Sequence, residues 1–129
     1  MKNVLFLDWP CFGSVDAIYT LEQQMGYTLT KFFHKDYQER ISSDFDNYFS
    51  EIIKGKHFKF CFSFNYYPVV AENCKKHDIP YISISFDTGC YLYENRTYSA
   101  YLAVYTCACF DTRFDDWSWN AFSYIERFL

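Results

Sequence analysis

The sequence Phe-Lys-Phe-Cys-Phe-Ser-Phe-Asn-Tyr-Tyr-Pro at residues 58–68 is the stretch that decides the expected fold. Up to Phe64 it alternates aromatic with other side chains, a pattern that predicts a buried strand. Asn65-Tyr66-Tyr67-Pro68 then interrupts the pattern, and residues 69–77 predict a helix, for which Pro68 suits the first position. A strand that ends in polar and aromatic groups just before a helix is typical of the binding edge of an open α/β sheet.

Strand-like and helix-like segments alternate along the rest of the chain. The expected strands are residues 3–7, 27–33, 58–64, 81–86 and 102–110, and the expected helices are residues 14–25, 44–53, 69–77 and 117–129. Residues 34–43 are interpreted as a surface connection and residues 88–101 as a long loop. The alternation predicts a Rossmann-like α/β fold, a three-layer sandwich around a mostly parallel sheet of about five strands in the order 3-2-1-4-5. We expect residues 1–129 to form a single domain.

Composition and charge exclude several classes of function. The net charge is −4 and there is no basic run, so we expect no nucleic-acid partner. The apolar run at residues 3–7 is too short for export or for a membrane span, which predicts a cytoplasmic protein with reduced thiols. No closely spaced Cys or His residues elsewhere in the chain could complete a ligand set with Cys107 and Cys109, so we expect no metal site. Residues 9–14 contain a single glycine, and no phosphate-binding loop is present, so we expect no nucleotide cofactor.

Polar and aromatic residues follow several of the expected strands. Because the carboxyl ends of parallel strands share one edge of a sheet, these residues are expected to converge there. Aromatic faces that pack on C–H groups, together with carboxylates that accept from hydroxyls, suit a sugar or another hydroxylated ligand. Each residue also has a structural interpretation, as a helix cap, a turn former or a cover for the core. The predicted ligand-binding residues are Asp8, Trp9, Asn65, Tyr66, Tyr67 and Asp87.

A nucleophilic cysteine is a further interpretation. Cys11 lies near the start of the first expected helix, where the helix dipole would lower its pKa, and Cys90 lies in a loop. Among the histidines, His34 follows the second expected strand and is the one that could reach the edge of the sheet as a base. The sequence does not identify catalytic residues beyond this Cys–His alternative.

Several segments together resemble a known family. Residues 3–10, 32–37, 60–68, 71–77 and 79–83, with Asp87 after the fourth expected strand, resemble the N-terminal domain of bacterial glycosyltransferase-like proteins related to spore maturation proteins. The resemblance implies the Rossmann-like half of a two-domain GT-B type enzyme, the half that mainly shapes the acceptor side. It loosens after Asp87, where the chain reads Thr88-Gly89-Cys90. The donor-binding half is expected to be absent from this chain, and whether the chain is an enzyme is therefore left open.

Two functions follow as expectations. The first is a stand-alone or truncated glycosyltransferase N-terminal-like domain that binds a sugar, a nucleotide sugar or a partner at the carboxyl edge and does not transfer sugar unaided. The second is a protein–protein interaction module or homodimer without a small-molecule site, in which exposed aromatic residues contact another chain.

Overall fold

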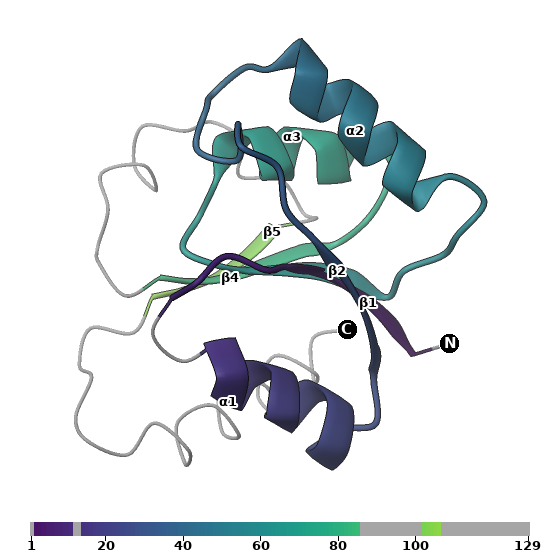
Figure 1. Ribbon diagram of the computed structural model, residues 1–129, viewed down its shortest axis with the longest axis vertical. Coiled ribbons are helices and arrows are strands. Elements are labelled where there is room, and N and C mark those ends of the chain that lie inside the picture. Colours follow the sequence, from purple (N-terminus) through teal and green to yellow (C-terminus); the bar gives the residue numbers. More distant parts are fainter. Residues whose placement is uncertain (1, 12–13, 86–101, 107–129) are drawn as a thin grey trace.

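The computed structural model describes residues 2–11, 14–85 and 102–106, and Figure 1 shows the arrangement of their helices and strands. The elements in chain order are β1 (Asn3–Leu7), α1 (Ser14–Tyr19), the π-helical turn η1 (Thr20–Gln24), β2 (Thr28–Phe32), α2 (Ser43–Ile53), β3 (Phe60–Phe64), α3 (Pro68–Lys76), β4 (Tyr81–Ser85) and β5 (Leu102–Thr106).

All strand pairs in the sheet are parallel, and the strand order is β2-β1-β3-β4-β5. The helix α1 lies on one face of the sheet, whereas α2 and α3 lie on the other face (Figure 1). The expectation of an α/β fold with a parallel sheet is therefore confirmed, and the layers are consistent with the Rossmann-like class.

The predicted strand order 3-2-1-4-5 is wrong. In the structure β1 lies between β2 and β3, so the chain reverses direction across the sheet one strand earlier than expected. The physical reason lies in the side chains of β2, where Thr28 and Lys31 are exposed. Every residue of β3 is buried, as a strand covered on both faces requires, whereas a lysine is tolerated on an edge strand. The apolar strand therefore takes the central position, and β2 takes the edge.

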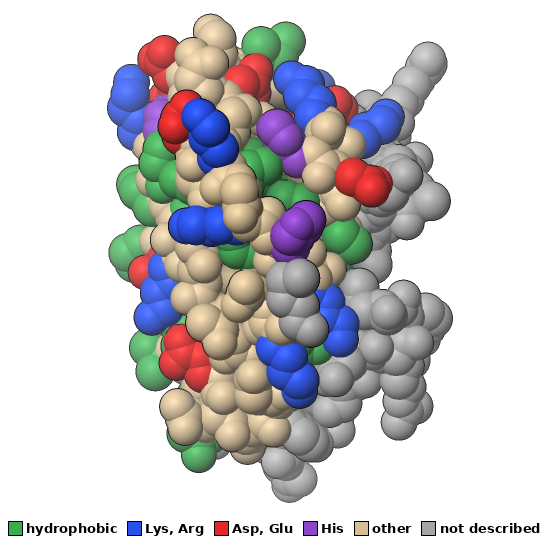
Figure 2. All heavy atoms as spheres, turned by 90° about the vertical axis from the view of Figure 1, so that its right-hand side faces the viewer, with side chains coloured by type: hydrophobic (Ala, Val, Ile, Leu, Met, Phe, Trp, Pro, Cys, Tyr) green, Lys and Arg blue, Asp and Glu red, His purple; other side chains and the backbone are tan. Residues whose placement is uncertain are grey.

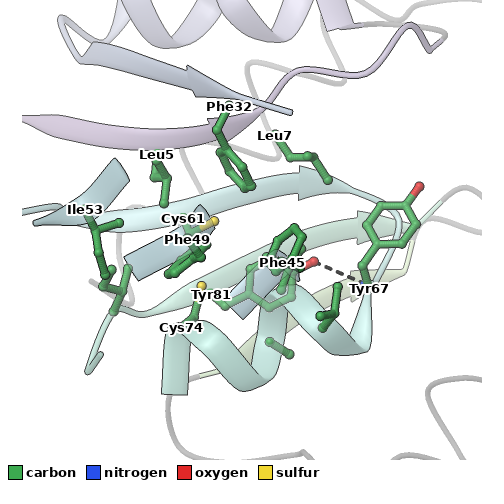
Figure 3. Packing of buried hydrophobic residues seen from close by; sticks show 14 of the residues in the cluster. Leu5, Leu7, Phe32, Phe45, Phe49, Ile53, Cys61, Tyr67, Cys74 and Tyr81 are labelled. Atoms are coloured by element: carbon green, nitrogen blue, oxygen red, sulfur yellow. Dashed lines mark hydrogen bonds between the residues drawn. The ribbon is translucent and has the colours of Figure 1, made fainter. Parts of the chain in front are cut away.

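Two hydrophobic clusters fill the two sides of the sheet. On the α1 side Phe6 and Phe62 stack with their ring centroids 5.5 Å apart, and Ala17 and Leu21 pack over them. On the other side Cys61 and its neighbours pack against α2 and α3; Figure 3 shows side chains of this cluster, among them Phe45, Phe49, Cys74 and Tyr81. Alternate residues of β3 thus point into opposite clusters, which anchors this strand more firmly than any edge strand.

Several expected boundaries shift by one or two residues. Pro68 is the first residue of α3 as predicted, but β2 and β3 are shorter than expected. The first expected helix changes after Tyr19 into η1 and ends before Gly26, whose φ of +75° is a left-handed conformation that favours glycine. The expected loop at residues 88–101 and the expected helix at residues 117–129 lie outside the described residues, and a single domain over residues 1–129 stays a prediction.

Candidate functional site

The carboxyl ends of β1 and β3 form the point at which the chain reverses across the sheet. After β1 the chain passes to α1 on one face, and after β3 it passes to α3 on the opposite face. In open α/β sheets the segments that follow two such strands separate and form the binding crevice. The observed order therefore makes Asp8 and Trp9 the neighbours of residues 65–67, whereas the predicted order would have placed Asp8 beside Asp87.

Three aromatic side chains meet at this position. The ring centroids of Trp9 and Tyr67 lie 6.3 Å apart in an edge-to-face arrangement, those of Trp9 and Tyr37 lie 6.1 Å apart and stacked, and those of Tyr37 and Tyr67 lie 5.0 Å apart. Trp9 and Tyr37 are half-buried, and the Trp9 Nε1–H donates to the Phe64 carbonyl at 3.3 Å. We call Trp9, Tyr37 and Tyr67 the aromatic cluster. The contacts among the three rings fix the positions of the partly exposed Trp9 and Tyr37 rings. Fixed, partly exposed rings of this kind can pack against an apolar ligand or the C–H face of a sugar.

The turn at residues 65–67 is fixed from below by buried side chains. Asn65 has a φ of +63°, a left-handed conformation that asparagine tolerates better than most residues. The Ser63 Oγ–H donates to the Asn65 carbonyl at 2.7 Å, and the Tyr67 N–H donates to the Tyr81 hydroxyl at 3.3 Å, the bond drawn as a dashed line in Figure 3. The Ser63 and Tyr81 hydroxyl oxygens are 2.5 Å apart. The turn is thus tied to the sheet by two buried hydrogen bonds and one that is partly buried.

The predicted site residues differ in their exposure and in their contacts. Asp8 is exposed, and its carboxylate makes no hydrogen bond or ion pair with any residue that the structure describes. Asn65 is half-buried, and Tyr67 belongs to the aromatic cluster. Tyr66 is only 4% exposed and packs on Tyr81 with ring centroids 6.0 Å apart, so it supports the turn from the core. Asp87 lies outside the described residues.

Tyr37 is absent from the predicted site residues, because residues 34–43 are interpreted from the sequence as a surface connection. Tyr37 lies in a charged segment that follows β2, and its ring also contacts Phe33 with the centroids 5.4 Å apart. The available signal was an aromatic residue within an otherwise polar stretch directly after a strand. Such a residue is expected to find a ring partner at the carboxyl edge, as Tyr37 does.

The structure does not support a Cys11–His34 pair. Burial raises the pKa of Cys11 to about 11, although hydrogen bonding to Ser14 works in the opposite direction, so the expected lowering of its pKa is wrong. The His34 ring packs on Phe45 and Tyr48 with centroid distances of 5.5 and 5.0 Å, and its Nδ1 accepts from the Asp36 N–H at 3.1 Å. His34 therefore stabilises the segment before α2, and Cys90 lies outside the described residues.

A groove of about 420 Å³ is lined by residues of α2, of α3 and of the segment that precedes α2. One wall is held in place by Asp46, which accepts from the Asn73 Nδ2–H at 2.8 Å and pairs with Lys76 at 3.7 Å. The half-buried Glu72 carboxylate makes no hydrogen bond or ion pair with any residue the structure describes. The groove is lined by Arg40, Ile41, Ser42, Asp46, Pro68, Val69, Glu72 and Lys76. It has the size of a small-molecule site but balanced charge, so it indicates no particular ligand.

The opposite side of the molecule carries dispersed charged side chains. Figure 2 shows the side that holds the N-terminus and the end of α2, with Lys, Arg and His side chains dispersed over it. Lys75 and Lys76 in the last turn of α3, and the Lys2 Nζ that donates to the Met25 carbonyl at 3.2 Å, are placed where helix ends favour positive charge. These cations therefore have a structural explanation.

No group of three His, Cys, Asp or Glu side chains within residues 2–11, 14–85 and 102–106 is placed to hold a metal ion. In the same part of the chain no helix has the length and apolar character needed to cross a bilayer.

Comparisons with protein-family models, with curated proteins and with solved structures found no match for this chain.

Proposed function

We propose that this chain is a glycosyltransferase N-terminal-like domain that binds a sugar-like ligand at the carboxyl edge of its sheet. The observation that carries the proposal is the aromatic cluster at the reversal point between β1 and β3, with the exposed Asp8 directly preceding Trp9 in the chain. Aromatic rings pack on the C–H faces of sugars, and an unpartnered carboxylate accepts hydrogen bonds from their hydroxyls. The family resemblance of residues 3–10, 32–37 and 60–68 adds support, because all three cluster residues lie within those segments.

The proposal concerns binding and not unaided transfer of sugar. Glycosyl transfer needs a base or a stabilising carboxylate in contact with the reacting groups. Of the described acidic residues near this edge, Asp36 is already engaged by Ser42 and Lys35, whereas Asp8 is exposed. The Cys11 thiol, whose pKa is raised by burial, and the His34 ring, whose Nδ1 accepts from the Asp36 N–H, offer no base to act with Asp8. A sugar or a nucleotide sugar is therefore the proposed ligand, and whether a reaction follows is a separate question.

Titration of the ¹⁵N-labelled chain with methyl β-glucoside and with UDP-glucose tests the proposal. We expect shifts at the backbone amides of Trp9, Tyr37 and Tyr67, and an affinity loss of about tenfold for Asp8→Asn, because a hydrogen bond to a charged acceptor is replaced by a weaker bond to a neutral amide. Tyr19→Ala is the matched control, since Tyr19 is an exposed tyrosine on α1, away from this edge. Saturable shifts confined to other surfaces, or equal losses for Asp8→Asn and Tyr19→Ala, would contradict the proposal.

A protein partner or a second copy of the chain is the second candidate function. The observation that favours it is the exposure of two large apolar side chains in the segment after β2, with Phe33 48% and Ile41 90% exposed. Exposed apolar side chains beside an aromatic cluster are typical of protein contacts. Sedimentation velocity at increasing concentration tests self-association: a dimer that Ile41→Asp dissociates supports this candidate, and a monomer throughout removes the homodimer.

A further inference from the structure

Four groups form a continuous chain of hydrogen bonds beneath the candidate site. It runs from the Tyr67 N–H to the Tyr81 hydroxyl at 3.3 Å, on to the Ser63 hydroxyl at 2.5 Å, and ends at the Asn65 carbonyl at 2.7 Å. Ser63 lies on β3 and Tyr81 on β4, and both side chains are almost completely buried. The two ends of the chain are the backbone groups that begin and end the turn at residues 65–67.

The donors and acceptors in this chain can be assigned. A serine hydroxyl has one proton, and the Asn65 carbonyl can only accept, so the Ser63 proton points to Asn65. The Tyr81 proton must then point to the Ser63 Oγ, which leaves the Tyr81 oxygen to accept from the Tyr67 N–H. Every proton has one acceptor, and reversing any one bond would leave a buried group without its partner.

The arrangement requires that Tyr81 keeps its proton. Burial raises the pKa of Tyr81 well above its usual value, although hydrogen bonding with Ser63 works in the opposite direction. The hydroxyl is therefore neutral over the whole physiological pH range. The ring of Tyr81 has a separate task, because it packs on Tyr66 with the centroids 6.0 Å apart.

We propose that Tyr81 and Ser63 are positioning residues for the carboxyl-edge site. Their hydroxyls hold the backbone of residues 65–67 in the one conformation that directs the Tyr67 ring toward Trp9 and Tyr37, and that presents Asn65 at the edge. The left-handed φ of Asn65 supports this, because such a conformation persists where surrounding groups fix it. The role in ligand binding rests on the proposed function, whereas the control of the turn does not.

Tyr81→Phe is the sharpest test, because it deletes one oxygen and keeps the ring that packs on Tyr66. We expect unchanged far-ultraviolet circular dichroism and hydrogen exchange at the Tyr67 amide that is faster by about tenfold, since this amide loses its acceptor. The amides of Cys61 and Phe62, which lie in the body of β3, should exchange as in the native chain. If methyl β-glucoside or UDP-glucose binds the native chain, its affinity should fall by a similar factor.

Tyr27→Phe is the matched control, because Tyr27 is also a buried tyrosine but packs in the opposite cluster, on the α1 side. It should leave exchange at Tyr67 unchanged. Ser63→Ala removes the donor to the Asn65 carbonyl and the acceptor of the Tyr81 proton, so it should loosen the turn and speed exchange at the Tyr67 amide by less than Tyr81→Phe does. It serves as the test if Tyr81→Phe does not fold. Unchanged exchange at Tyr67 in either variant would overturn the positioning role. Faster exchange without ligand binding by the native chain would uphold that role and overturn the proposed function.

Discussion

The segments that follow β3 and β2 each supply one ring to the aromatic cluster, but they are held in different ways. The turn after β3, at residues 65–67, is mostly buried and is tied to the sheet by the hydroxyls of Ser63 and Tyr81. The segment after β2, at residues 33–42, is largely exposed, and the Phe33 N–H donates to the Tyr48 hydroxyl at 3.2 Å near its start. Tyr67 is therefore held by a turn packed against the core, whereas Tyr37 is held by a largely exposed segment.

The segment after β2 depends mainly on local hydrogen bonds. The Tyr37 N–H donates to the His34 carbonyl at 3.1 Å, and the Glu39 N–H donates to the Asp36 carbonyl at 3.0 Å. Exposed local bonds of this kind open at lower free energy than buried bonds between strands. The difference between the two segments suggests how a ligand would be accommodated: Tyr37 adjusts its position, while Tyr67 provides a fixed surface.

The largest effect is expected for Tyr66→Ala, which removes a buried ring from beneath the fixed turn. Deleting a large buried aromatic side chain leaves a cavity and lowers the free energy of unfolding by about 3–5 kcal/mol. Phe33→Ala, in the exposed segment, should change the free energy of unfolding by no more than about 0.5 kcal/mol. Urea denaturation followed by circular dichroism measures both values. Similar losses for the two variants would remove the distinction between a fixed and an adjustable segment.

A smaller effect is expected for Ser42→Ala, at the end of the segment after β2. The Ser42 Oγ accepts from the Phe45 N–H at 3.0 Å as the N-cap of α2, and its own proton is donated to the Asp36 Oδ2 at 2.8 Å. Loss of an N-cap side chain lowers the free energy of unfolding by about 1 kcal/mol. Urea denaturation gives this value, and hydrogen exchange at the Glu39 amide reports on the segment.

Ser43→Ala is the control for this prediction, because Ser43 is the exposed residue next to the N-cap. It should change the free energy of unfolding little and leave exchange at Glu39 unaltered. If Ser42→Ala left exchange in residues 33–42 unchanged, the segment would not depend on its local hydrogen bonds, and the comparison with the turn after β3 would lose its physical basis.

The fold class was predictable because apolar strands alternate with helices of clear period. The predicted strand order was wrong because it followed the usual Rossmann arrangement without comparing the polarity of the strands. Lys31 and Thr28 indicate an edge strand, whereas the apolar stretch at residues 60–64 indicates a central one. Compared with each other, these two segments would have favoured the observed order. The change in order is what brings Asp8 and Trp9 beside residues 65–67.

The candidate site was predictable only in part. Asp8, Trp9, Asn65 and Tyr67 directly follow strands, and their place at the carboxyl edge follows from the parallel sheet. Tyr37 was not predictable in the same way, because its contact with Tyr67 depends on how residues 33–42 fold back toward the edge. The burial of Tyr66 depends on the ring of Tyr81, which lies on a different strand. Contacts of this kind come from tertiary packing and have no local pattern.

The last prediction concerns the segment after β1 and tests whether it is fixed like the turn after β3 or opens like residues 33–42. The Cys11 carbonyl accepts from the Ser14 N–H and from the Ser14 hydroxyl, both at 3.3 Å, and burial raises the pKa of the Cys11 thiol from 9.0 to about 11. Since the thiolate is the reactive form, alkylation of Cys11 by iodoacetamide near about pH 8 should be slower than in the urea-unfolded chain by on the order of a hundredfold. Mass spectrometry of the Cys11 peptide measures both rates.

Because the pKa of Cys11 is raised in the folded state, the free energy of unfolding should decrease at alkaline pH. The folded state keeps the Cys11 proton up to about pH 11, whereas the unfolded chain releases it near pH 9.0. The unfolded state is therefore favoured as the pH rises through this interval, and Cys11→Ala should lose less stability there than the native chain does. If Cys11 instead reacted as fast in the folded chain as in urea, the segment after β1 would open as readily as residues 33–42. The turn after β3 would then be the one fixed part of the candidate site.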